Sequence, residues 1–262
     1  EEMWKYLTDN APDTAAFAPF LCENDFHNYK AVLKGIIRGR EYESLLILPA
    51  SVELPVLEKA VKEKRFDLLP DYMRKPAAEA YEVLAQSGDS QLADCIIDAG
   101  CMSAQTLLAE KSKNTVIKDL ITVSVFYKNI KAALRAAKTG RSAQFIESTL
   151  TETGVVSKKA MVTAALGGEE KVLELLGKAV TVGGAEAAEA YKKSPGDFEK
   201  YADNRLLSTA KRCKYITIGI EPLIGYMLAR KAQITDLQII YSGVKTGQGS
   251  DKTLERLREL YG

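Results

Sequence analysis

The chain repeats part of its own sequence. The segment that begins Asn28-Tyr-Lys30-Ala-Val-Leu and ends at Gly39-Arg40 has a partner that begins Asn129-Ile-Lys131-Ala-Ala-Leu and ends at Gly140-Arg141, offset by 101 residues (129 − 28) without a gap. A second match joins Glu79-Ala-Tyr81 to Glu189-Ala-Tyr191 at an offset of 110 (191 − 81). Two different segments that recur in the same order at nearly the same period indicate copies of one domain, roughly a hundred residues long.

Apolar residues at helical spacing predict that these copies are α-helical. Over residues 25–40 one stripe collects Phe26, Tyr29, Val32, Leu33, Ile36 and Ile37, and Gly39 ends the helix. Two further helices are expected, one over 56–61 with Ser51 as its N-cap and one over 250–262 that ends at Gly262. Residues 44–48 and 237–241 are possible strands, but neither alternates cleanly. The predicted class is all-α.

The matched segments divide the chain into three repeats. The predicted boundaries are 1–75 for an incomplete first repeat, 76–184 for a complete second and 185–262 for a third. Linkers are expected at Arg74-Lys-Pro76 and at Val182-Gly-Gly184, because proline and glycine interrupt regular structure. The first repeat lacks a Glu-Ala-Tyr half, from which we expect an N-terminal segment to be absent.

Composition argues against several functional classes. Lysine and arginine number 36 against 35 aspartates and glutamates, so there is no excess charge to attract nucleic acid or a membrane surface. His27 is the only histidine, which rules out a metal site with two histidines. The four cysteines form no Cys-x-x-Cys pair and are expected to be reduced, buried thiols. The most apolar stretch, 215–229, is too short to cross a bilayer. We expect no cofactor, metal or membrane span.

Two local motifs have structural explanations that we prefer to catalytic ones. The glycine-rich segment 243–253 resembles a phosphate-binding loop, but Asp251 precedes Lys252 where a phosphate would have to approach, so we expect a turn before the last helix. Asp25 and His27 lie close together in the sequence. A catalytic role would need a third group and a pocket, and we expect Asp25 to cap its helix instead.

The repeated Asn28/Asn129 and Lys30/Lys131 pairs call for a shared role, because asparagine is unfavourable inside a helix. One interpretation is a hydrogen bond between helices that closes each domain. The other is a polar rim that several copies present to one partner. The first is favoured, and the second stays open.

The C-terminal part of the chain resembles a known family. Glu221-Pro-Leu-Ile-Gly-Tyr226, Ala229-Arg-Lys-Ala232, Leu237-Gln-Ile-Ile240 and the final Leu254–Tyr261 segment are similar to the end of the C subunit of V-type and A-type rotary ATPases, whose eukaryotic counterpart is the d subunit. The Asp25–Lys30 stretch and Asn129-Ile-Lys131 resemble its two Asn-x-Lys elements. Phe126 stands where the family pattern has an aspartate, and Gln238 where a basic residue is often found.

The resemblance implies three similar helical domains around a pseudo-threefold axis, shaped as a funnel, with the first domain truncated at its N-terminus. It implies a non-catalytic rotor component, a monomer within the complex, on the cytoplasmic side of the membrane. Such a component would pass torque between the D and F shaft subunits and the membrane ring of ion-carrying subunits. The candidate partner-facing residues are Asn28, Lys30, Asn129, Lys131, Arg135, Glu221 and Arg230. The alternative is a free-standing helical-repeat scaffold that binds proteins, although a period of a hundred residues is long for a solenoid.

Overall fold

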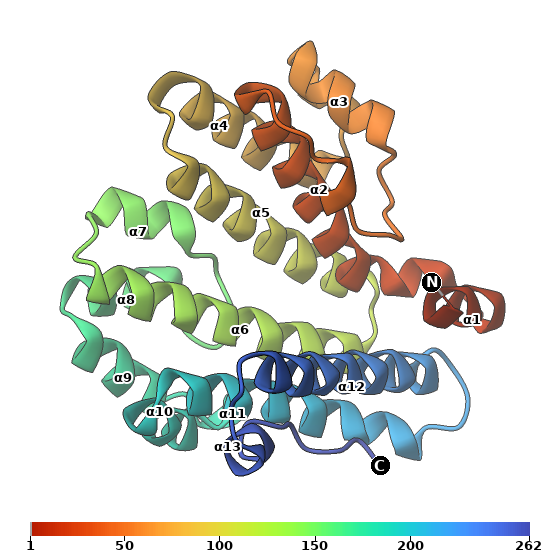
Figure 1. Ribbon diagram of the computed structural model, residues 1–262, viewed down its shortest axis with the longest axis vertical. Coiled ribbons are helices and arrows are strands. Elements are labelled where there is room, and N and C mark those ends of the chain that lie inside the picture. Colours follow the sequence, from red (N-terminus) through yellow and green to blue (C-terminus); the bar gives the residue numbers. More distant parts are fainter. Residues whose placement is uncertain (1) are drawn as a thin grey trace.

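The computed structural model describes residues 2–262, and within that range it contains thirteen α-helices, five short 3-10 turns and no β-strand. The all-α prediction is therefore confirmed. Both possible strands belong to other structures: 44–48 lies in a 3-10 turn and the loop after it, and 237–241 lies inside a long helix. In Figure 1 the helices form an upper group and a lower group, with the two chain ends on one side of the molecule.

The helices fall into successive groups along the chain. The first residues form α1 (Glu2–Asn10), and the upper group consists of α2 (Ala18–Arg38), α3 (Leu54–Lys62), α4 (Asp71–Ser87) and α5 (Ser90–Lys111). The next group contains α6 (Thr115–Lys138), α7 (Ala143–Thr149), α8 (Lys158–Leu166), α9 (Glu169–Gly177), α10 (Gly184–Lys193) and α11 (Pro195–Ala210). The chain closes with α12 (Glu221–Lys245) and α13 (Ser250–Leu254).

Buried apolar side chains form three cores. The first spans residues 22–104 and joins α2, α3, α4 and α5; the second spans 123–202 and joins α6 to α11. The third draws on both ends of the chain, because Leu7 and Phe17 pack with Ile224 and Met227 against the start of α6. The first core includes residues on both sides of 75/76, and the second includes residues on both sides of 184/185. The three-repeat division at those points stays a prediction.

The linker predicted at Arg74–Pro76 is wrong, because these residues lie inside a packed helix. Arg74–Pro76 lies inside α4, where a Cβ on Gly100 of α5 would overlap the Pro76 ring, so the two helices cross at close range. Residues 182–184 form a tight turn. Gly183 has φ +77° there, and a Cβ on Gly184 would overlap the carbonyl oxygen of Leu176.

Three predicted helix ends also need correction. Asp25 is not a cap, because α2 begins seven residues earlier, with Pro19 in its first turn. Helix α3 begins at Leu54, with Pro55 in its first turn, and its N-cap is Glu53 and not Ser51. The last helix ends at Leu254 instead of Gly262. Beyond it the backbone N–H groups of Arg258 and Glu259 donate to the side chains of Asp236 (2.8 Å) and Asn204 (2.9 Å). These hydrogen bonds hold the tail extended across α11 and α12.

Among the described helices, α5 alone is long and apolar enough to cross a membrane by length and composition. Of its most apolar window, 44% is buried inside the molecule. It contributes Ile97 and Cys101 to the first core, and it packs against α2 and α4. These contacts are those of the central helix of a packed domain.

Candidate functional site

The repeated asparagines make the same pair of contacts. Asn28 donates from Nδ2 to the carbonyl oxygen of Ile47 (3.0 Å), and its Oδ1 accepts from the Ile47 backbone N–H (2.8 Å). Asn129 does the same with Thr151, at 3.0 Å for both bonds. Each side chain is nearly or fully buried, 3% and 0% exposed. Each amide therefore takes the place of a backbone partner and fixes a loop further along the chain, after the 3-10 turn at 43–45 for Asn28 and after α7 for Asn129. This is the domain-closing interpretation, although the bond is to a loop instead of a helix.

The repeated lysines also have equivalent partners. Lys30 forms an ion pair with Asp98 of α5 (2.6 Å), and Lys131 forms one with Glu199 of α11 (3.4 Å). In both cases the acid lies 68 residues after the lysine (98 − 30 and 199 − 131). The sequence repeat is thus also a structural repeat, in which α2 with α5 corresponds to α6 with α11.

In the first repeat the anchored loop has further bonds to α2. Asp25 Oδ1 accepts from the backbone N–H groups of Ser51 (2.6 Å) and Val52 (3.0 Å), and the His27 ring bonds to the Leu45 carbonyl oxygen (3.0 Å). Asp25 is fully buried and its Oδ2 has no partner, so burial raises the pKa of this carboxyl despite the two N–H donors. Asp25 therefore anchors a loop. Phe126, at the equivalent place in the second repeat, is a core residue.

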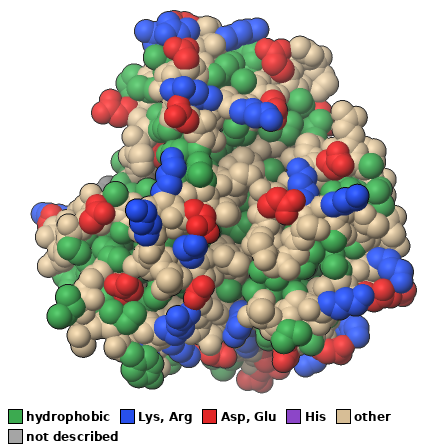
Figure 2. All heavy atoms as spheres, turned by 180° about the vertical axis from the view of Figure 1, so that it is seen from behind, with side chains coloured by type: hydrophobic (Ala, Val, Ile, Leu, Met, Phe, Trp, Pro, Cys, Tyr) green, Lys and Arg blue, Asp and Glu red, His purple; other side chains and the backbone are tan. Residues whose placement is uncertain are grey.

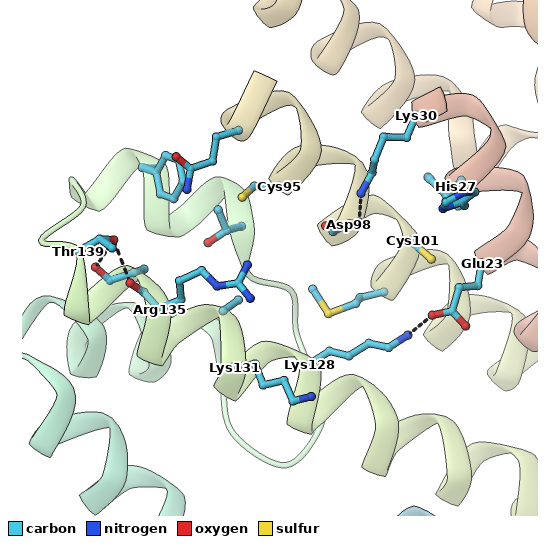
Figure 3. A pocket seen from close by; sticks show the side chains of 17 residues that line it. Glu23, His27, Lys30, Cys95, Asp98, Cys101, Lys128, Lys131, Arg135 and Thr139 are labelled. Atoms are coloured by element: carbon cyan, nitrogen blue, oxygen red, sulfur yellow. Dashed lines mark hydrogen bonds and ion pairs between the residues drawn. The ribbon is translucent and has the colours of Figure 1, made fainter. Parts of the chain in front are cut away.

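A cleft of about 390 Å³ lies between α2, α5, α6 and α7 (Figure 3). Its charged lining has four basic and two acidic side chains, so the basic charge is in excess: Lys30, Lys128, Lys131 and Arg135 against Glu23 and Asp98. Among the described residues each lysine has an acidic partner, whereas the Arg135 guanidinium has none. Three of the predicted partner-facing residues, Lys30, Lys131 and Arg135, come together in this cleft.

Charges from three long helices lie near one another beside the cleft. Glu23 of α2 pairs with Lys128 of α6 at 2.7 Å (Figure 3), and Lys231 of α12 and His27 act on the same carboxylate. Burial would raise the pKa of Glu23, but the two lysines outweigh it and the pKa is lowered. Burial, helped by the nearby Lys128, lowers the pKa of Lys231. One carboxylate thus lies near two lysines, of which Lys128 forms the ion pair with it.

The other two predicted residues lie on α12. Glu221 accepts a hydrogen bond from Asn114 Nδ2 (2.8 Å), which joins the start of α12 to the N-cap residue of α6. Arg230 is exposed and donates to Gln233 on its own helix (2.9 Å). Neither faces the cleft.

The remaining motifs have structural roles. The glycine-rich segment is a turn between α12 and α13, as expected, with Gly247 at φ +65°. All four cysteines are free. The Cys22 thiol donates to the carbonyl oxygen of Pro19 (3.5 Å), and the neighbouring Cys101 thiol together with burial raises the pKa of Cys22. Within residues 2–262 no three His, Cys, Asp or Glu side chains are grouped so as to hold a metal ion.

Comparison with known proteins decides the family. The model of the ATP synthase (C/AC39) subunit family matches residues 1–256. The chain belongs to this family. The C subunit of the V-type sodium ATPase of Enterococcus hirae is 22% identical to it over 264 residues, which cover 99% of this chain and 80% of that protein. The resemblance found in the motifs is thereby confirmed, and this C/AC39 protein is a component of a V-type ATPase.

Sequence reasoning missed the charged centre of this C/AC39 protein. Only Lys128 has a signal in the repeat: it lies 101 residues after His27 (128 − 27) and therefore occupies the position in the second repeat that His27 occupies in the first. Glu23 and Lys231 carry no such signal. Their meeting depends on how α12 packs against the first two helical groups, which no local pattern reveals.

Proposed function

We propose that this C/AC39 protein is a non-catalytic part of the rotor, which links the central shaft to the membrane ring and transmits torque between them. The observation that carries the proposal is the family match over almost the whole chain, together with a relative that is the C subunit of a V-type sodium ATPase. Torque transmission requires stiff helices that pack closely. The long helices α2, α6 and α12, each anchored by buried contacts, suit that requirement.

The cleft is the proposed contact for the D and F shaft subunits. Its excess basic charge favours a partner with acidic side chains, and Arg135 is the cation free to pair with them. Lys30 and Lys131 would contribute to the same basic rim. Asn28 and Asn129 would act indirectly, because their amides are bonded to the loops at 47 and 151, and those loops would face a partner.

The proposed architecture has three units around one axis, with the membrane ring on one face and the shaft in the hollow. The charged centre supports it, since α2, α6 and α12 each contribute to one cluster. The protein would work as a monomer within the complex, on the cytoplasmic side of the membrane.

Co-purification tests the proposal. The full-length tagged chain is expressed with the D and F shaft subunits of its own ATPase, and separately mixed with the detergent-solubilised ring. We expect binding in both arms. Arg135→Glu should weaken the shaft arm about tenfold, as loss and reversal of an interface charge does. Lys193→Glu changes another exposed cation, on α10 and outside the cleft, and should bind as the wild type does. Failure of the wild-type chain to bind either partner would refute the rotor assignment.

A further inference from the structure

Helix α12 exposes a regular row of large apolar side chains. Ile234, Leu237, Tyr241 and Val244 are 47%, 65%, 68% and 76% exposed. Single exposed apolar residues are ordinary on a protein surface and need no explanation. Four of them in one row, over roughly 15 Å of helix, form a continuous surface that the described chain leaves uncovered. In the view of Figure 1 no other element lies in front of α12.

The spacing of the row is that of a helix-pairing seam. The steps between its members are three, four and three residues, the a-d-a-d pattern of a coiled coil. The opposite side of the helix is already occupied. Ile239 is buried there, Gly243 lies directly against Thr253, and Asp236 accepts a hydrogen bond from the C-terminal tail. The chain's own packing therefore uses one face of α12 and leaves the heptad face free.

The charges beside the row indicate what would cover it. Arg230 continues the row towards the start of α12, and Lys245 flanks its far end; both are exposed. The two acidic residues of α12 lie elsewhere, Glu221 bonded to Asn114 and Asp236 on the covered side. A second copy of this chain would bring like charges together along such a seam, which is unfavourable. A helix with an apolar seam and acidic flanks would satisfy both the shape and the charge.

A lipid surface fits less well. Helices that lie in a membrane interface present a broad apolar face with basic residues on the other side. On α12 the exposed basic residues Arg230 and Lys245 stand at the ends of the apolar row and not on the other side of the helix. On the face seen in Figure 2, by contrast, apolar side chains are scattered among charged ones of both signs.

We propose that the Ile234–Val244 row of α12 is a docking surface for one amphipathic, acid-flanked α-helix of a neighbouring subunit in the same ATPase. This rests on the proposed function, because it takes the partner from within the rotor assembly. The helix packs its own apolar residues between Leu237 and Tyr241 in the knobs-into-holes manner. Docking here is separate from the shaft contact in the cleft, since none of the four residues lines that cleft.

Site-specific photo-crosslinking in the assembled complex tests the surface directly. The benzophenone amino acid p-benzoylphenylalanine replaces Leu237 or Val244 in the full chain, and crosslinked peptides are identified by mass spectrometry. These two positions are seven residues apart on one face of α12. We expect both to crosslink to one segment of one neighbouring subunit, at sites about seven residues apart, because two paired helices advance together. Val180, which is highly exposed on the turn before α10, is the matched control and should not label that segment.

Binding of variants gives a second measure. Leu237→Lys should weaken association with the complex about tenfold or more, and Val180→Lys should leave it unchanged. Crosslinks to lipid, to a second copy of this chain or to scattered sites would overturn the proposal, as would unchanged association of Leu237→Lys. If the wild-type chain assembles while these results appear, the rotor assignment stands and only the docking surface fails. If the wild-type chain does not assemble, both fall.

Discussion

Replacing Asn129 by alanine tests the structural repeat most directly. The substitution removes two hydrogen bonds of 3.0 Å and leaves both the N–H and the carbonyl group of Thr151 without a partner. Thr151 is itself buried, so water cannot easily replace the lost amide. An unsatisfied buried polar group costs about 1–3 kcal/mol, which gives about 2–6 kcal/mol for the pair. That is a large part of the total stability of about 5–15 kcal/mol that is usual for a folded protein.

The equivalent change at Asn28 should cost less. Asn28 makes the same two contacts, but Ile47 is exposed, so water can reach the freed backbone groups. We expect about 1–2 kcal/mol for Asn28→Ala. Asn10→Ala is the control, because Asn10 is exposed and bonds only within its own helix; it should change stability by less than about 0.5 kcal/mol.

Urea unfolding followed by far-ultraviolet circular dichroism measures these differences, with the slope checked for constancy between variants. Asn129→Asp adds a pH test. Its carboxylate would still accept from the Thr151 N–H, but its second oxygen would face the Thr151 carbonyl oxygen and repel it. The substitution should therefore be nearly as harmful as alanine at neutral pH. It should be milder in acid, where the protonated carboxyl can donate to that carbonyl oxygen. A loss below about 1 kcal/mol for Asn129→Ala, or a larger loss at Asn28, would refute the reasoning.

Three further predictions concern other buried contacts. Burial raises the pKa of Asp25, so the folded state keeps this proton to higher pH than the unfolded chain; its contribution to stability is present in acid and is lost as pH rises through the folded pKa. Asp25→Asn should remove that pH dependence at a cost below about 1 kcal/mol. Asp25→Ala should cost about 2–4 kcal/mol, because two backbone N–H groups lose their acceptor. Urea titrations at several pH values measure both variants. Gly184→Ala should lower the thermal midpoint by at least several degrees, since its Cβ would meet backbone, and Gly249→Ala, with open space around it, should not. The lowered pKa of Glu23 stabilises the folded wild type above the unfolded pKa, and this stability is lost as pH falls through the folded pKa. Glu23→Gln should abolish this contribution. An equal fall of the unfolding free energy with acid in the two proteins would contradict the prediction.

The sequence predicted the parts of the fold that depend on local pattern. The stripe from Phe26 to Ile37 gave helix α2 and its end at Gly39, where φ is +61°. The 101-residue offset identified the two asparagines and the two lysines, and the structure gives each pair matching contacts. The repeat predicted these contacts because each copy makes the same asparagine–loop hydrogen bonds and the same lysine–acid ion pair, which require the same residue types at equivalent positions.

Contacts between distant segments could not be predicted in this way. Helix α1 packs on α12 through Tyr6 and Tyr226, whose rings are 5.3 Å apart, although 220 residues separate them (226 − 6). The position of Asp25 was misjudged because α2 extends upstream through Ala18–Cys22, which looks like loop sequence around Pro19. The C-terminal tail has helical spacing, yet its backbone is held by Asp236 and Asn204, and these tertiary bonds override a weak local preference.

The charged centre connects the fold to the proposed task. Glu23, Lys128 and Lys231 are only half-buried, with the Glu23 and Lys128 side chains 46% and 35% exposed, so the ion pair by itself adds little to stability and does not explain why the three charges meet. Each of the three comes from a different long helix, and Glu23 faces both lysines only when all three helices are in place. The cluster therefore penalises any relative shift of α2, α6 and α12, which a torque-bearing protein must resist. Because the lining of the cleft has basic charge in excess, an acidic group from a partner would add a further contact to the same arrangement, so binding in the cleft and rigidity of the protein should increase together.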